Sequence, residues 1–137
     1  MTYEIFNPEV LGAPRGWNNG MLAPAGGRVL FVAGQVASDE TGRIVADDFA
    51  EQFGVALGNC VSVVREAGGS ARDIGRLTIY VTDMEAYRNS LEALGPVYRE
   101  AMGRHFPAMA LVRVAELVDP AAKVEIEATA VLTPEGD

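Results

Sequence analysis

The chain has few of the residues that build metal centres or disulfides: among 137 residues there is one cysteine, Cys60, and one histidine, His105. A single cysteine forms no internal disulfide, which fits a reducing compartment. One histidine and one cysteine give no zinc constellation, so we expect no metal site. No apolar run approaches the ~20 residues that a membrane-spanning helix needs. The opening MTYEIFNPEV also lacks the basic stretch and apolar core of a secretory signal. A cytoplasmic protein without a membrane segment is therefore predicted.

Basic residues are also scarce. Lysine and arginine total 11 against 19 aspartate and glutamate, which gives a net charge of −8 and a pI near 4.6. Proteins that bind nucleic acids usually present a basic surface to the phosphates, so DNA or RNA is not expected as a main partner. No Gly-rich phosphate loop or serine-nucleophile elbow occurs either.

The remaining composition is that of an ordinary globular protein, with 49% hydrophobic and 22% charged residues. No internal repeat, linker or low-complexity segment divides the sequence. We therefore expect a single domain spanning residues 1–137, which is long enough to enclose one core.

Six segments have the composition and patterning of β-strands: 3–6, 21–23, 29–32, 77–81, 108–114 and 124–132. The apolar run at 29–32 is uninterrupted, which is typical of a strand buried on both faces. In the last segment Glu125 and Glu127 alternate with apolar residues, so this strand presents one polar face and one apolar face.

Two amphipathic helices are predicted between these strands. The first begins at Asp47 or Asp48, either of which can cap its free amides, and ends at Gly68-Gly69. A capping-box pattern over 70–73 indicates one further short turn. The second helix begins after Thr82 and continues to Met102, with a kink or break expected at Gly95-Pro96.

The resulting order is β-β-β-α-β-α-β-β, an α+β arrangement. Each helix has a single apolar stripe, so both helices are expected to pack on one face of a mixed β-sheet. The second face of that sheet then needs its own cover, which makes it a candidate subunit interface.

Five segments together resemble the Rid proteins, also called the YjgF or reactive-intermediate deaminase family, whose RidA-like members sometimes carry the label L-PSP endoribonuclease. The segments are VLFVAGQVASDETGRIV, EQFGVALGNCVSVVREAGGS, DIGRLTIYVTDM, FPAMALVRVAEL and VEIEATA. The resemblance covers Tyr3 to about Leu132. It implies a chorismate-mutase-like fold and a homotrimer with its sheets inside, its helices outside and three clefts between subunits.

The resemblance also implies a chemistry. In the deaminating members each cleft holds a 2-imino acid, which is hydrolysed to a 2-keto acid and ammonia without metal or cofactor. An arginine binds the substrate carboxylate, and a glutamate positions or activates the water. Glu125 matches that glutamate and is the candidate catalytic residue. The alternative is a sheet glutamate that faces solvent or pairs with a basic neighbour.

Met109 stands where the resemblance places the arginine. Methionine cannot form a bidentate clamp on a carboxylate, so the standard imino acid is expected to bind poorly. Met109 then either packs the floor of the cleft or shapes an apolar pocket for an uncharged or aromatic ligand.

Other departures remove polar groups from the same region. Trp17 replaces a tyrosine, Ala33 replaces a serine, and Gly95 stands where an asparagine is common. A less polar binding pocket follows, with Trp17, Met109 and Leu111 as its walls and Ala33 in the substrate-binding set.

Two arginines are candidates to compensate for the lost clamp. Arg15 precedes Trp17 in a loop that should reach the cleft, so it either binds the ligand or is solvated. Arg113 shares a strand face with Met109. It lies too far along the strand to replace the clamp directly, and a surface or inter-subunit ion pair suits it better.

Four further residues have simpler interpretations. Asn18 and Asn19 are turn residues that favour left-handed backbone angles, or ligand hydrogen-bonding groups. His105 is a helix cap or surface residue rather than an acid or base. Cys60 lies on the apolar stripe of the first helix, as a small core residue would.

The sequence thus predicts a small organic ligand bound in intersubunit clefts. An imine or enamine would be hydrolysed there by water held at Glu125. The alternative is a non-catalytic trimer that binds or senses an apolar metabolite. RNA cleavage, suggested only by the endoribonuclease label, conflicts with the net charge of −8.

Overall fold

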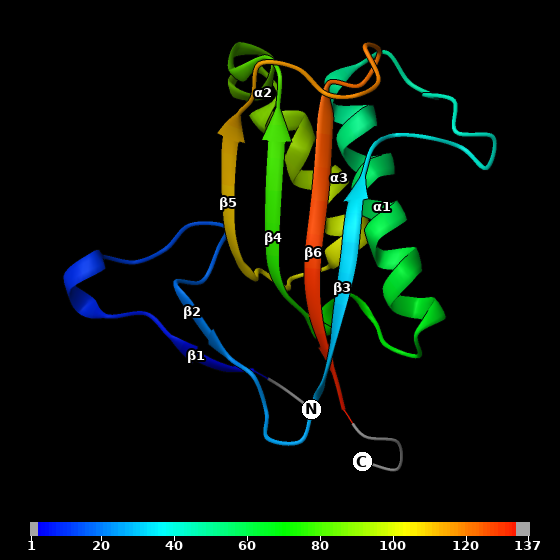
Figure 1. Ribbon diagram of the computed structural model, residues 1–137. Coiled ribbons are helices and arrows are strands. Elements are labelled where there is room, and N and C mark those ends of the chain that lie inside the picture. The colour runs from blue at the N-terminus through cyan, green and yellow to red at the C-terminus, as the bar shows by residue number, and fades with distance from the viewer. Residues whose placement is uncertain (1–2, 134–137) are drawn as a thin grey trace.

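In the computed structural model, residues 3–133 are described, and they form a four-stranded sheet with helices on one side and a separate two-stranded sheet (Figure 1). The strands are β1 (Glu4–Phe6), β2 (Gly20–Leu22), β3 (Arg28–Gln35), β4 (Ile74–Val81), β5 (Ala108–Arg113) and β6 (Val124–Leu132). The helices are α1 (Phe49–Glu66), α2 (Met84–Asn89) and α3 (Leu91–Met102), with short 3₁₀ segments η1 (Glu9–Leu11) and η2 (Ala71–Asp73).

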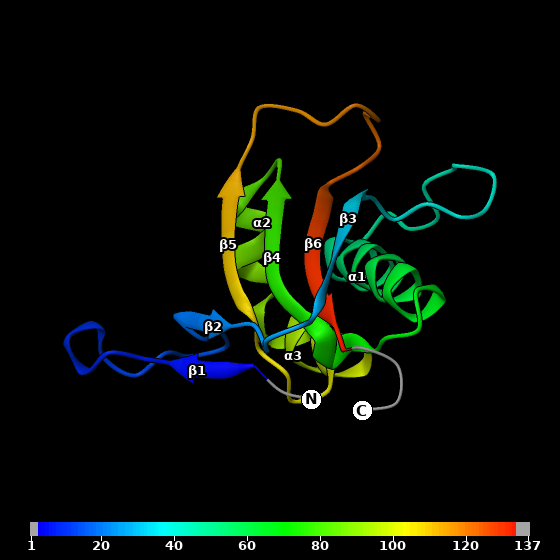
Figure 2. The ribbon, with the colours of Figure 1, turned by 60° about the horizontal axis from the view of Figure 1, so that its bottom comes forward.

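The main sheet has the strand order β3-β6-β4-β5. β6 pairs antiparallel with both β3 and β4, whereas β4 and β5 are parallel. This confirms the predicted mixed sheet and the α+β fold class. The first two strands do not join it: β1 and β2 pair only with each other and project beyond the sheet (Figures 1 and 2).

All three helices lie behind the same face of the sheet (Figure 1). The Asp48 carboxylate accepts a hydrogen bond of 3.1 Å from the backbone N–H of Glu51, so Asp48 is the N-cap of α1. The buried stripe of α1 packs against alternate residues of β4 and β6. Leu57 of α1 and Ile126 of β6 are both fully buried at this contact. The core therefore lies entirely between the sheet and the helices.

The opposite face of the sheet is open. Along β6 every second residue is buried, and Glu125 and Glu127 belong to the alternate, partly exposed set. In β3 the side chains of Val29 and Phe31 are 57% and 80% exposed. The expectation that this strand is buried on both faces is therefore wrong for the single chain. Its apolar run marks a second apolar face that no element of the described chain covers.

The second predicted helix is two helices. The chain breaks at Ser90, between α2 and α3, and Pro96 lies inside α3 rather than at the break. The Ser90 hydroxyl donates to the Ala86 carbonyl at 2.7 Å, and its backbone N–H donates to the Tyr87 carbonyl at 3.0 Å. These two bonds satisfy the last carbonyls of α2 and end that helix before the proline is reached.

A long loop between β1 and β2 extends past the sheet on the β5 side (Figures 1 and 2). Asn18 ties its return to the segment before β5, since its side-chain amide donates to the Phe106 carbonyl at 2.7 Å. Its backbone N–H donates to the Pro107 carbonyl at 3.4 Å. This attachment brings residues 15–17 beside the helix-facing side of β5.

No helix within residues 3–133 combines the length and apolar character needed to cross a bilayer.

Candidate functional site

A cavity of about 440 Å³ opens between β5, the helices α2 and α3, and the loop that carries Trp17. Its lining comes from all four of these regions and is mostly apolar. The lining residues are Arg15, Gly16, Trp17, Phe53, Ile79, Tyr87, Leu91, Leu94, Gly95, Tyr98, Arg99, Phe106, Met109 and Leu111.

Five of the residues singled out from the sequence meet in this cavity: Arg15, Trp17, Gly95, Met109 and Leu111. Met109 is aligned with Leu77 across the parallel β4–β5 pair, and residues in register share a sheet face. Met109 and Leu111 therefore point toward the helices, where they pack against the core.

The loop that presents Trp17 is held by asparagine side chains. The Trp17 indole N–H donates to Asn19 Oδ1 at 3.2 Å, and Asn7 Nδ2 donates to Asn18 Oδ1 at 2.9 Å. Neither Asn18 nor Asn19 has a positive φ, so their interpretation as left-handed turn residues is wrong. Gly16 carries the left-handed angle instead, with φ of 85°.

One wall of the cavity is a stacked aromatic pair. The rings of Tyr98 and Phe106 are parallel within 2° and their centroids lie 5.3 Å apart. The Tyr98 hydroxyl donates to the His105 carbonyl at 2.7 Å. Burial raises the pKa of Tyr98, so the phenol stays neutral and acts as a donor.

His105 strengthens the same wall from behind. Its Nε2 lies 2.6 Å from the Ile74 carbonyl oxygen, and because a carbonyl only accepts, Nε2 carries the proton. The half-buried imidazole thus ties the segment before β5 to the start of β4. It is a half-buried cross-link and not the helix cap or surface residue expected from the sequence.

Glu125 lies on the other, open face of the sheet, because its register partner is Tyr80 and not a core residue. Its carboxylate rests against Gly34, where an added Cβ would lie 2.2 Å from Oε2. Within residues 3–133 the carboxylate has no hydrogen bond within 3.5 Å and no ion pair within 4.0 Å. It is therefore available to an external molecule.

The neighbouring glutamate is already engaged. The Tyr80 hydroxyl donates to Glu127 Oε1 at 2.7 Å, and this bond raises the pKa of Tyr80. Of the two glutamates on this face of β6, Glu125 is thus the one left to act chemically.

The predicted site residues consequently fall into two groups. Arg15, Trp17, Met109 and Leu111 line the helix-side cavity, whereas Glu125 lies on the open face and Ala33 is an exposed residue of β3. A single chain does not bring these groups together.

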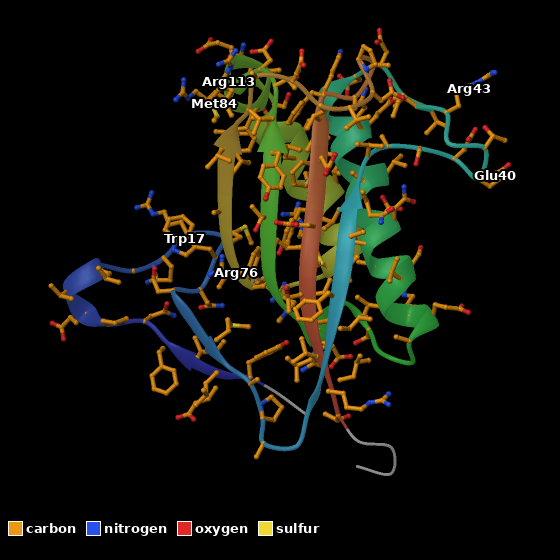
Figure 3. All side chains as sticks on the ribbon, in the orientation of Figure 1. Trp17, Glu40, Arg43, Arg76, Met84 and Arg113 are labelled. Carbon is orange, nitrogen blue, oxygen red and sulfur yellow. The ribbon has the colours of Figure 1, made fainter. Side chains whose placement is uncertain are left out.

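Arg113 belongs to neither group. Its Nε donates to the Thr82 carbonyl at 3.3 Å at the far end of β5, well away from Trp17 in Figure 3.

Sequence reasoning missed Arg99. It is an exposed residue of α3 that lines the cavity one helical turn after Gly95. The signal available was the i, i+4 spacing of these two residues, which puts both on one helix face.

Cys60 is confirmed as a core residue. Its thiol donates to the Ile126 carbonyl at 3.2 Å, and burial raises the pKa of Cys60 to about 12. Within residues 3–133 no three histidine, cysteine, aspartate or glutamate side chains gather as metal ligands.

The strand order and the helices packed on one face of the sheet define an α+β protein of the YjgF/Rid fold. The family described as Endoribonuclease L-PSP matches residues 12–132, and the chain belongs to that family.

Three similar proteins show the range of this family. The Rid family protein YyfB of Yersinia pestis has a solved structure with a TM-score of 0.84 and 32% identity, covering 96% of this chain and 100% of that one. The structure of Escherichia coli TdcF with bound serine has a TM-score of 0.65 and 31% identity, covering 89% and 92%. The 2-iminobutanoate/2-iminopropanoate deaminase of Homo sapiens is 28% identical, covering 78% and 75%.

Proposed function

We propose that this protein hydrolyses an imine or enamine of a small organic molecule to a carbonyl compound and ammonia, in clefts between subunits of a homotrimer. The observation that carries the proposal is the Glu125 carboxylate, held against Gly34 on the open face with no partner among the described residues. The family membership and the human relative's deaminase name support the reaction class.

The reaction needs one base and one water. Glu125 accepts a proton from water as the water oxygen bonds to the imine carbon, and it returns that proton to the nitrogen, which gives a carbinolamine. The same carboxylate then takes the proton of the carbinolamine hydroxyl and passes it to the nitrogen, so that the C–N bond breaks and ammonia leaves as the carbonyl forms. An enamine enters the same path after it tautomerises to the imine. No electron is exchanged with an outside group, so the balance requires only water.

The two-faced arrangement supports a shared site. Glu125 and the apolar cavity lie on opposite faces of one sheet, so a substrate that needs both must lie between two copies. Phe31, which is 80% exposed beside Thr129, gives the open face an apolar surface for a neighbouring subunit. The homotrimer and the cytoplasmic location stay predictions from the family resemblance and the composition.

The test is ammonia release from freshly generated 2-imino acids, including bulky apolar ones. We expect Glu125→Gln to abolish turnover. Glu127→Gln is the matched control, since the amide oxygen of a glutamine at that position can still accept the Tyr80 hydrogen bond. Met109→Arg is assayed beside both, and should accelerate turnover of small imino acids if a carboxylate clamp there is all they lack. Undiminished turnover by Glu125→Gln would disprove the mechanism.

Subunit mixing tests whether the site is shared. Glu125→Gln and a cavity-filling Leu111→Trp should each be inactive alone. In a randomly mixed trimer each mixed assembly regains one intact cleft, so an equal mixture recovers about a quarter of wild-type turnover. No recovery, in assemblies shown by mass spectrometry to be mixed, would place the whole site in one subunit.

A second candidate function is ligand binding without catalysis. The observation that favours it is Met109 in the cavity floor, where the resemblance implies the substrate arginine. Thermal stabilisation by an apolar ligand, with no ammonia from any imine tested, would support it.

A further inference from the structure

The helix-side cavity carries positive charge although the strand position 109 holds a methionine instead of an arginine. Among the described residues that line it, the charged ones are Arg15 and Arg99, and no aspartate or glutamate is present. Neither arginine forms an ion pair within 4.0 Å inside residues 3–133. In a chain with net charge −8, two unneutralised arginines at one apolar cavity indicate an anionic ligand.

Arg99 packs over Gly95, one helical turn before it. A Cβ built on Gly95 would lie 3.4 Å from Arg99 Nη1 and 3.8 Å from Nη2. The guanidinium group therefore lies over the bare backbone of Gly95. A side chain longer than alanine at 95 would extend into its place.

Arg15 comes from a different element. It lies in the loop before Gly16, and the asparagine contacts around Trp17 hold that loop against the segment preceding β5. Both arginines are exposed, so their guanidinium groups lie at the rim while the interior remains apolar. A rim position leaves the charge hydrated in the empty protein and available to a ligand.

We propose that Arg99, assisted by Arg15, is the anion anchor of this cavity, and that its ligand is a carboxylic acid with a bulky aromatic or branched apolar body. This rests on the proposed function, because it names the substrate class of the same cleft. An arginine offers a carboxylate two parallel N–H donors from whichever element it projects.

The interior fits the rest of such a ligand. The stacked Tyr98–Phe106 pair and Trp17 supply aromatic surface, and Met109 supplies a polarisable contact where a guanidinium group would exclude an apolar body. A volume of about 440 Å³ exceeds what a two- or three-carbon acid fills, so bulk is expected to raise affinity.

Binding is measured with three matched probes: 3-phenylpropanoate, its neutral analogue 3-phenylpropanamide, and propanoate, which has the carboxylate without the ring. Trp17 is the single tryptophan and lines the cavity, so its fluorescence reports occupancy. We expect 3-phenylpropanoate to bind at least about tenfold more tightly than either analogue, since the amide loses a charge-assisted bond and propanoate loses the apolar contact.

The variants assign the anchor. Arg99→Gln should weaken 3-phenylpropanoate by about tenfold and leave 3-phenylpropanamide unchanged, with a smaller effect from Arg15→Gln. Gly95→Leu, which crowds the guanidinium group, should reproduce the Arg99→Gln loss. Arg43→Gln is the control, because Arg43 lies on the opposite side of the molecule from Trp17 (Figure 3).

Two results would overturn the assignment: equal affinity for the acid and the amide, or unchanged acid affinity in both Arg99→Gln and the double variant with Arg15→Gln. Binding is read without turnover, so the two proposals fail separately. Arginine-dependent binding without ammonia release removes the deaminase function and keeps the anchor. Turnover by a protein that does not distinguish acid from amide keeps the function and removes the anchor.

Discussion

Replacing Gly34 with alanine should displace the Glu125 carboxylate and abolish its function, although Glu125 itself is not mutated. An alanine Cβ at this position would lie 2.2 Å from Glu125 Oε2, 2.9 Å from Cδ and 3.1 Å from Cγ. These atoms are the end of a flexible side chain, so the carboxylate moves and the backbone stays. Ordinary contact begins at 3.4 Å, so Oε2 must retreat by about 1 Å, a misplacement that can cost roughly 100-fold in rate.

The fold should tolerate the same change. Gly34 is not among the glycines with positive φ, so alanine meets no backbone strain there. Alanine also restricts the unfolded chain, which stabilises a compatible site by about 0.4–1 kcal/mol. We therefore expect the free energy of unfolding to be unchanged or slightly higher.

The assay pairs ammonia release with urea denaturation for Gly34→Ala, Glu125→Gln and the double variant. Both single changes act on the same catalytic carboxylate, so their effects on rate should be far from additive. The double variant should therefore match Glu125→Gln. Wild-type turnover by a normally folded Gly34→Ala would refute the placement of Glu125 as the base. A loss of more than about 2 kcal/mol of stability would refute the claim that only the side chain yields.

Three further predictions concern the scaffold. Gln52→Leu should cost about 2–4 kcal/mol in urea denaturation, because the buried amide donates to the carbonyls of Ala46 and Ala121 at 2.9 and 3.0 Å and accepts from the Lys123 N–H at 2.8 Å. Cys60 should resist thiol reagents at pH 8 until the protein unfolds. Its pKa is raised from 9.0 to about 12, so its stabilising contribution is complete below pH 9 and is lost as the pH rises toward 12, a loss that Cys60→Ala should remove. Phe31→Glu should weaken subunit association and so lower the molecular mass measured by analytical ultracentrifugation. The circular dichroism should stay unchanged, since Phe31 is 80% exposed on the open face of the single chain.

Local signals predict the helix ends and strand positions well. Asp48 caps α1, and Ser70 and Asp73 form the capping box that their spacing predicts. The sequence predicts an interruption of the second helix at Gly95-Pro96, but the break lies at Ser90, because a side-chain bond to the preceding turn ends α2 first. The proline can be recognised from the sequence, whereas the hydrogen bonds of Ser90 depend on the turn that the folded chain forms.

The site is harder to predict because it depends on strand register and on faces. The sequence predicts Arg15, Trp17, Met109, Leu111 and Glu125 for one intersubunit cleft; in the single chain the first four line one cavity, whereas Glu125 lies on the opposite face of the sheet. Alternation places a residue on one of two faces but does not say which face a distant strand shares with it. That information comes from the alignment of Tyr80 with Glu125 and of Leu77 with Met109.

Arg99, Gly95 and Met109 make sense together rather than singly. An exposed arginine on a helix is ordinarily a solvated residue, and a glycine inside a helix is ordinarily a weakness. Both line the same cavity as a methionine that occupies the expected arginine position. On the proposed assignment the three residues act together: Arg99 supplies the cation from the helix, Gly95 lies under its guanidinium group, and Met109 offers apolar surface to the body of the ligand.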